Sequence, residues 1–240
     1  MRLLPAVDIR DGRAVRLRQG DFRDETVYAD DPLEAARSFV EAGAEFLHVV
    51  DLDGAREGRP AGLGHLGRMT RELKVPVQYG GGLRSLEAVE EALDAGAERV
   101  VLGIAAYTDP ALLDRALERF GPRVAVALDV RGGRASVSGW TEQTDLVPEE
   151  VVRTMEARGV EAFVYTDVER DGMLEGPDLE EVRRIAQATR ASFVYSGGVS
   201  SVEDLKSLRS LDLGNLEGVI SGKALYEGRL GVQEALEALR

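Results

Sequence analysis

The 240-residue chain contains an internal repeat, because its two halves begin with the same short pattern. An apolar run that starts at Leu3 ends at Asp8, and a second run that starts at Val124 ends at Asp129. Each run is short, apolar and followed by turn residues, as expected of a buried strand. The repeat therefore predicts two similar halves, at about residues 1–121 and 122–240.

The rest of the sequence alternates between short apolar runs and segments with helical periodicity. Eight runs have the composition of strands that are buried on both faces, as parallel strands are. They are Leu3–Val7, Phe46–Val50, Val77–Tyr79, Val100–Leu102, Val124–Leu128, Ala162–Tyr165, Phe193–Tyr195 and Val219–Ile220. Helix-capping residues and terminal glycines separate them. Eight such units predict an α/β fold, the (β/α)8 TIM barrel, with a two-fold half-barrel repeat and a single domain over residues 1–240.

The composition limits the functions that the chain can perform. Its net charge of −13 argues against nucleic acid or an anionic membrane as the main partner. Cysteine is absent, which excludes disulfides, thiolate metal sites and cysteine nucleophiles, and only two histidines are present. We therefore expect carboxylates to perform acid–base chemistry without a metal. No apolar run approaches the ~20 residues of a membrane helix, so we expect a cytoplasmic protein.

Glycine-rich segments follow matching strands in the two halves. A strand, two glycines and a helix N-terminus together admit a phosphate to backbone N–H groups. A single Gly-Gly pair also occurs in ordinary turns, but its repetition on adjacent strands of both halves favours anion sites. The sequence thus predicts a ligand with a phosphate at each end. The predicted binding residues are Gly81, Gly82 and Gly103 in the first half, and Gly176, Gly197, Gly198, Gly222 and Lys223 in the second.

Asp8 and Asp129 end the first and fifth of the eight predicted strands. These strands face each other across a barrel, whose active site lies at the C-terminal ends of the strands. Strand-end aspartates can instead cap turns or pair with arginines such as Arg10 and Arg131. As a symmetric pair beside the ligand's centre, the two carboxylates favour chemistry, with one acid and one base.

Two other side chains have open or ordinary interpretations. Trp140, the only tryptophan, lies in a loop after the fifth predicted strand. It is suited either to stacking on a flat ring of a ligand or to fixing the loop to the barrel rim. His48 lies within an apolar strand, where we expect a buried histidine with satisfied hydrogen bonds.

Five segments together carry a resemblance to a known family. They are Leu4–Asp21, Leu47–Gly54, Gly80–Arg84, Gly139–Glu142 and Tyr165–Gly172. These segments resemble the histidine-biosynthesis isomerases that act on phosphoribosylformimino-aminoimidazole carboxamide ribotide. The resemblance implies an Amadori rearrangement of an aminoaldose to an aminoketose, on a small bis-phosphate substrate and without a metal or cofactor.

The same resemblance implies roles for individual residues. Asp129 is expected to be the general acid that opens the ribose ring, and Asp8 the base that removes the proton from C2. Thr166 and Asp171 match positions that support the site. Trp140 matches a loop residue that stacks on the imidazole of the substrate.

Two related activities are the main alternatives. Relatives that also isomerise phosphoribosylanthranilate tend to carry arginine at the position of Ser138, so this serine argues against dual activity. In the sister cyclase of imidazole glycerol phosphate synthase, the first strand usually reads Cys-Leu-Asp-Val and a Lys-rich segment follows it. The segments Pro5–Ile9 and Arg16–Gly20 of this chain fit the isomerase better. A non-catalytic phosphate-binding scaffold has no need for two opposed carboxylates.

We expect a monomer that binds neither nucleic acid nor a membrane.

Overall fold

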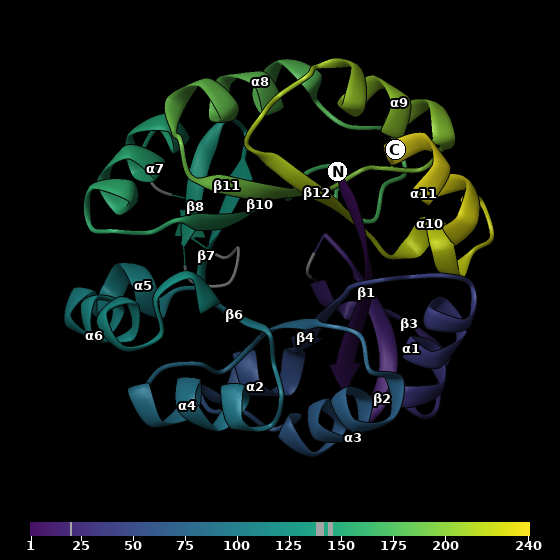
Figure 1. Cartoon of the computed structure of the whole chain (residues 1–240), viewed down its shortest axis with the longest axis horizontal. Helices are drawn as coiled ribbons and strands as arrows, with labels where there is room; N and C mark the ends of the chain where they lie inside the picture. Colours follow the sequence, from purple (N-terminus) through teal and green to yellow (C-terminus); the bar gives the residue numbers. More distant parts are fainter. Residues whose placement is uncertain (20, 138–141, 144–145) are drawn as a thin grey trace.

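The computed structural model describes residues 1–19, 21–137, 142–143 and 146–240, and its core is a closed ring of eight parallel strands (Figure 1). The strand β1 pairs with both β4 and β12, and β7 pairs with both β6 and β10, so the ring has no open edge. The predicted (β/α)8 barrel and its eight strands are confirmed. The strands are β1 (Arg2–Arg10), β4 (Leu47–Asp51), β5 (Val77–Gly80), β6 (Arg99–Leu102), β7 (Val124–Arg131), β10 (Ala162–Asp167), β11 (Ser192–Ser196) and β12 (Leu216–Ser221).

Helices connect the strands and surround the ring (Figure 1). Several of them begin at a side chain that caps the helix. Asp31 accepts a hydrogen bond from the backbone N–H of Leu33 at the start of α1, and Ser201 and Asp204 form a capping box at α9. In the part of the chain that the structure describes, no helix is long and apolar enough to cross a membrane. The helices are α1 (Pro32–Glu41), α2 (Leu52–Glu57), α3 (Leu63–Leu73), α4 (Leu86–Asp94), α5 (Ala105–Thr108), α6 (Pro110–Phe120), α7 (Pro148–Ala157), α8 (Leu179–Ala188), α9 (Val202–Ser210), α10 (Lys223–Tyr226) and α11 (Val232–Leu239).

Short antiparallel strands extend β1 and β7 beyond the barrel, and the sequence did not predict them. They are β2 (Arg13–Arg18) and β3 (Asp21–Ala29) beside β1, and β8 (Arg134–Val137) and β9 (Glu142–Gln143) beside β7. The turn into β2 has positive φ at Asp11 and Gly12, and the turn into β8 has positive φ at Gly132 and Gly133. This is the backbone of a tight hairpin whose twist matches that of its strands.

The two hairpins have the same register around the two candidate catalytic aspartates. Asp8 lies opposite Val15 in the first hairpin, and Asp129 lies opposite Ser136 in the second. The sequence repeat therefore corresponds to a repeat in backbone structure at both places where a carboxylate ends a barrel strand.

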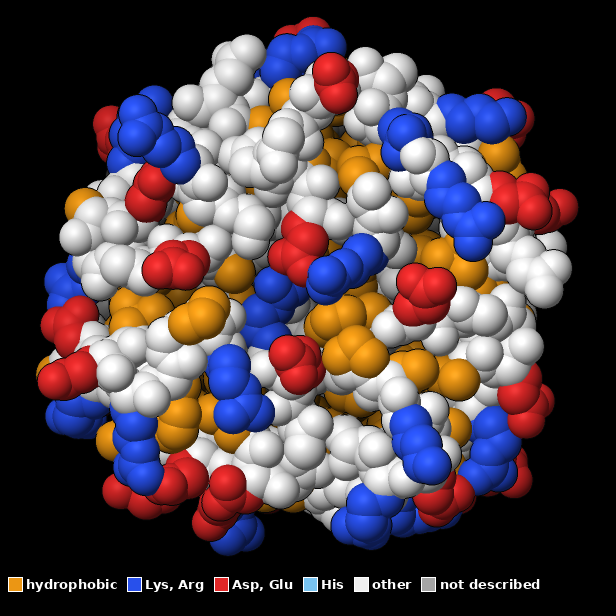
Figure 2. Space-filling model, viewed as in Figure 1, with side chains coloured by type: hydrophobic (Ala, Val, Ile, Leu, Met, Phe, Trp, Pro, Cys, Tyr) orange, Lys and Arg blue, Asp and Glu red, His pale blue; other side chains and the backbone are white. Residues whose placement is uncertain are grey.

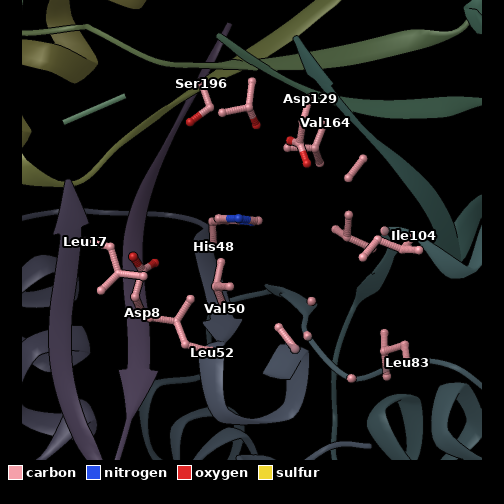
Figure 3. Close-up of a pocket in the computed structure, with 18 of the residues that line it drawn as sticks. Asp8, Leu17, His48, Val50, Leu52, Leu83, Ile104, Asp129, Val164 and Ser196 are labelled. Carbon is pink, nitrogen blue, oxygen red and sulfur yellow. The ribbon is translucent and has the colours of Figure 1, made fainter. Parts of the chain in front are cut away.

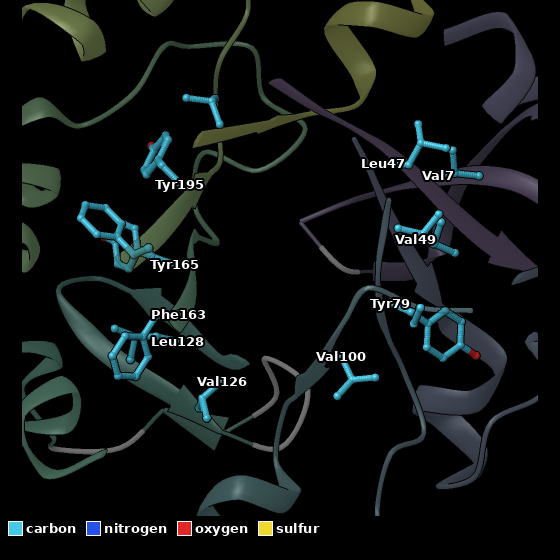
Figure 4. Packing of buried hydrophobic residues seen from close by; sticks show 14 of the residues in the cluster. Val7, Leu47, Val49, Tyr79, Val100, Val126, Leu128, Phe163, Tyr165 and Tyr195 are labelled. Carbon is cyan, nitrogen blue, oxygen red and sulfur yellow. The ribbon is translucent and has the colours of Figure 1, made fainter. Parts of the chain in front are cut away.

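The strands bury an apolar cluster on each side. Val7, Tyr79 and Phe163 are fully buried in the cluster between the strands and the helices (Figure 4). A second cluster fills the inside of the barrel, since successive strand residues such as Ala6 and Val7 point to opposite faces. On the visible surface, acidic and basic side chains are interspersed (Figure 2). Local geometry, rather than a broad basic surface there, must attract an anion.

Candidate active site

A cavity of about 280 Å³ lies at the C-terminal ends of the barrel strands. Asp8 on β1 and Asp129 on β7 both line it (Figure 3), and these strands are opposite each other in the eight-stranded ring. Thr166 and Asp171 line the same cavity. The two predicted catalytic aspartates and the two residues that match supporting positions thus line the same cavity.

A smaller cavity adjoins the first and shares four lining residues with it, namely Arg16, Asp171, Ser196 and Ile220. The two predicted glycine sets fall on different cavities. The larger cavity contains Gly81, Gly82 and Gly103, whereas the smaller one contains Gly197, Gly198, Gly222 and Lys223. Gly176 lies beside the smaller cavity, because its N–H donates to the carbonyl of Gly198.

The paired glycines have the same backbone geometry in both halves. Gly81 and Gly197 have φ values of 115° and 120°, which strongly favour glycine. A Cβ atom at Gly81 would lie 2.2 Å from the carbonyl oxygen of Asp51, and one at Gly197 would lie 2.6 Å from that of Asp167. These glycines are therefore already required by the close packing of the preceding loop, independently of any ligand.

Gly103 differs from the paired glycines. No atom outside its own neighbours lies within 4 Å of the position that its Cβ would take, and the residue lines the larger cavity. The missing side chain of Gly103 thus leaves open space in the cavity, whereas those of Gly81 and Gly197 make room for neighbouring backbone. Among the glycines of the first half, this one best matches the prediction of space left for a ligand.

Asp8 is a buried carboxylate held by an arginine. Its Oδ2 accepts a hydrogen bond of 2.9 Å from Nη1 of Arg16, and Nη2 of Arg16 lies 3.4 Å from Oδ1 of Asp171. Burial raises the pKa of Asp8 to about 6, against the opposing effect of Arg16 and with a further increase from the nearby Asp171. The Oδ1 atom of Asp8 is buried and has no hydrogen-bond partner among the described residues. This carboxylate is mostly ionised at neutral pH yet more basic than an exposed aspartate.

Arg16 is a residue of this site whose role was not predicted from the sequence. It comes from β2, which returns along β1 after the turn at Asp11 and Gly12. An Asp-Gly pair between two strand-forming segments is a recognised hairpin pattern. That pattern was available in the sequence and could have placed a basic residue of β2 beside Asp8.

His48 also lines the cavity with Asp8 and Asp129. It is only 8% exposed, and its Nδ1 lies 2.8 Å from Nε2 of Gln78. Burial lowers the pKa of His48 to about 3, assisted by the positive charges of Arg16 and Arg99. The expectation of a buried histidine with a hydrogen-bond partner is confirmed, but its position in the cavity wall was not foreseen.

The loop beside the first glycine pair is organised by Asp51, which is fully buried. Its carboxylate accepts four hydrogen bonds of 2.7 Å, from the backbone N–H groups of Gly54, Ala61 and Gly62 and from the hydroxyl of Tyr79. Since Gly81 packs directly on the backbone of Asp51, this network fixes the surface on which the glycine pair rests.

Two expectations concern parts of the chain that the structure does not describe. Trp140 and Ser138 lie outside the described residues, so the structure does not test the stacking and dual-activity predictions. Within the described ranges, His, Cys, Asp and Glu side chains form no group of three or more that could hold a metal ion.

Comparison with known proteins shows the family of this chain. A family model described as "Histidine biosynthesis protein" matches residues 2–231. A protein of Gloeobacter violaceus is 47% identical over 99% of this chain and 93% of its own length, and one of Paramagnetospirillum magneticum is 45% identical over the whole of both chains. A third, from Desulforudis audaxviator, is 48% identical over 98% of this chain and 90% of its own. All three are named 1-(5-phosphoribosyl)-5-((5-phosphoribosylamino)methylideneamino) imidazole-4-carboxamide isomerase. The chain therefore belongs to the histidine biosynthesis protein family.

Proposed function

We propose that this protein is an aldose–ketose isomerase of histidine biosynthesis. Its substrate is the aminoaldose N'-(5'-phosphoribosyl)formimino-5-aminoimidazole-4-carboxamide ribonucleotide, and its product is the corresponding aminoketose. One observation carries the proposal: Asp8 and Asp129 end opposite strands and line one cavity, beside which the two glycine sets lie. The names of the full-length relatives support the same reaction.

In this proposal the two aspartates perform an Amadori rearrangement. Asp129 gives a proton to the ring oxygen of the ribose, which opens the ring and leaves a protonated imine at C1. Asp8 removes the proton from C2, and the electron pair of that C–H bond forms the C1–C2 double bond of an enolamine. Protonation at C1 and loss of the proton from the C2 hydroxyl then give the ketone. No atoms are gained or lost overall, so acid–base groups suffice.

The environment of Asp8 supports its assignment as the base. A general base is most effective when its pKa lies near the working pH, because it is then both ionised and basic. Burial raises the pKa of Asp8 to about 6, while Arg16 holds the ionised form in place. Asp8 thus combines both requirements at neutral pH.

The phosphates are proposed to bind at the two glycine sets. Gly103 offers open space at one end, and the smaller cavity at the other end contains Lys223 beside Gly222. The Nζ of Lys223 donates to the carbonyl of Gly172 at 3.0 Å, which keeps a positive charge at that cavity in an acidic protein. Trp140 is proposed to stack on the imidazole of the substrate, by family resemblance.

The proposed setting is a cytoplasmic monomer. A substrate with two phosphates is too polar to leave the aqueous compartment in which it forms, which supports a cytoplasmic location. This proposal assigns every step of the reaction to residues of one chain and calls on no residue of a second subunit.

The test is a direct assay of the purified protein on the aminoaldose, with formation of the ketose followed chromatographically. The expected result is turnover by the wild type, with turnover slower by about 10²- to 10⁴-fold for Asp129→Asn prepared in parallel. Phosphoribosylanthranilate is tested beside it, and we expect no conversion. A folded wild-type protein that leaves the aminoaldose unchanged would overturn the proposal.

A further inference from the structure

We propose that His48 is held as the tautomer with its proton on Nε2, and that this N–H group donates a hydrogen bond to the reacting sugar. Gln78 and Arg99 fix the tautomer from inside the barrel. The donor part of this inference depends on the function proposed above, whereas the tautomer is a property of the ligand-free protein. We call this row of hydrogen-bonded side chains the relay. It runs from Arg99 on β6 through Gln78 on β5 to His48 on β4, three neighbouring strands.

The direction of the first hydrogen bond is fixed by the chemistry of arginine. Nε of Arg99 donates to Oε1 of Gln78 at 2.6 Å, and a guanidinium group has no acceptor. Arg99 is itself held by Glu217, whose Oε2 lies 2.8 Å from its Nη1. The oxygen of the Gln78 amide must therefore face Arg99, which excludes the flipped amide.

The direction of the second hydrogen bond follows from the first. Because its oxygen faces Arg99, the amide of Gln78 turns its NH₂ group towards Nδ1 of His48, 2.8 Å away. An NH₂ group can only donate, so Nδ1 must accept and cannot carry a proton. The imidazole is neutral in this buried environment, so its single proton lies on Nε2.

The position of His48 gives this donor a function. In Figure 3 its ring projects into the space between the strands that carry Asp8 and Asp129, and all three residues line the cavity. This is where the carbons and oxygens of the sugar must lie if the two carboxylates move their protons. A neutral N–H group matches a hydroxyl or carbonyl oxygen there and leaves the two carboxylates as the acid and base.

The relay also breaks the symmetry of the barrel. The repeat places Gly197 at the position of Gly81, and the same offset of 116 places Val164 at the position of His48 and Val194 at that of Gln78. The second half therefore has no counterpart of His48 or Gln78. A nearly symmetric cavity could bind a bis-phosphate in two directions, and a single N–H donor favours the direction that places an oxygen beside it.

The first experiment determines the tautomer directly. The chain has only two histidines, so long-range ¹H–¹⁵N correlation spectra of the ligand-free protein contain two imidazoles, and His65→Gln identifies the remaining one as His48. We expect His48 to be protonated at Nε2 alone at pH 7. A proton on Nδ1, or on both nitrogens, overturns the proposal.

The second experiment inverts the relay. In Gln78→Glu, the carboxylate accepts from Arg99 with one oxygen and from Nδ1–H of His48 with the other, so the ring proton should move to Nδ1. Gln78→Met is the second variant, which removes the polar contact and should leave a mixture of tautomers. Ser192→Ala is the matched control, because Ser192 contacts Glu217 at 3.5 Å at the far end of the network. An unchanged Nε2 tautomer in both Gln78 variants overturns the relay.

Kinetic measurements then distinguish a hydrogen bond from His48 to the substrate from a purely structural role of His48. We expect Gln78→Glu and His48→Phe to lower kcat roughly 10- to 100-fold, the effect of one hydrogen bond lost in a buried site, with little change in KM. Ser192→Ala should behave as the wild type. A wild-type kcat in His48→Phe overturns the donor role. A wild-type protein that is inactive on the aminoaldose contradicts the proposed function instead, and the tautomer result is unaffected by that outcome.

Discussion

Arg16 donates a hydrogen bond from Nη1 to Oδ2 of Asp8 at 2.9 Å, inside a protein whose overall charge is strongly negative. The same guanidinium group also faces Asp171. One cation thus stabilises two buried carboxylates, and its attraction does not fully offset the cost of burial at Asp8, whose pKa is raised to about 6.

The pH dependence of the reaction follows from this balance. If Asp8 is the base, kcat/KM should fall about tenfold per pH unit as the pH is lowered below 6, because only the ionised form of Asp8 accepts a proton. The measurement is kcat/KM on the aminoaldose from pH 4.5 to 8. A flat profile across pH 6 would contradict the assignment.

Replacing Arg16 tests what holds Asp8 in its ionised form. In Arg16→Met the positive charge that lowers the pKa of Asp8 is lost, so the acidic limb of kcat/KM should move to higher pH. Arg37→Met is the control, because Arg37 pairs with Glu72 on the surface. A limb that stays at the wild-type pH in Arg16→Met would show that the pair does not set the pKa.

The contribution of Asp8 to the unfolding free energy should fall with rising pH, over the same range in which the activity rises. The folded-state pKa of Asp8 is about 6, above the ordinary value of 3.8, so the unfolded chain ionises first as the pH rises. The wild type therefore loses on the order of 3 kcal/mol of unfolding free energy between pH 4 and pH 7 through this group. Asp8→Asn cannot ionise there and should become more stable than the wild type by a growing margin over that range. Denaturant unfolding at both pH values measures the margin, and a margin independent of pH would contradict the raised pKa.

Both carboxylates should be indispensable for turnover. Asp8→Asn and Asp129→Asn preserve the shape of the side chain but remove the proton transfer, which is worth about 10²- to 10⁴-fold. We expect losses of that order in kcat, with circular dichroism unchanged. Wild-type turnover in either variant would exclude the mechanism with two aspartates.

The sequence was sufficient for the barrel because each of its strands is an apolar run bounded by caps and glycines. It also predicted that Asp8 and Asp129 end strands on opposite sides of the barrel, since a carboxylate at the end of a buried strand is conspicuous when it occurs twice. Arg16 and His48 were harder to identify because their roles depend on neighbours on other strands. Arg16 reaches Asp8 through a hairpin, and His48 acquires its partner only when β4 and β5 pair. A pattern within one segment contains neither relationship.

The glycines should separate into structural and ligand-facing residues. Gly81→Ala forces a positive φ and a contact with the backbone of Asp51, and should lower the unfolding free energy by about 3 kcal/mol or more. Gly159→Ala is the matched control, because Gly159 has a φ of 99° and no atom near its Cβ position, so its cost should be about 1 kcal/mol. Gly103→Ala should leave stability almost unchanged and raise KM, since its methyl group enters the cavity. Equal stability losses in all three variants would contradict this division.

Asp51 provides a last test of how the first glycine set is supported. Each of its carboxylate oxygens accepts from a donor: Gly54 on Oδ1, and Ala61, Gly62 and Tyr79 on Oδ2. Asp51→Asn is nearly isosteric, but whichever way the amide turns, its NH₂ group meets an N–H or O–H group that also donates. We expect a loss of about 3 kcal/mol, or about 6–12 °C in Tm for a chain of this length, together with a raised KM because the loop under Gly81 shifts. Tyr79→Phe removes only one of the four donors and should cost about 1 kcal/mol with little change in KM. If Asp51→Asn were as stable as Tyr79→Phe, the carboxylate would not be what organises the loop.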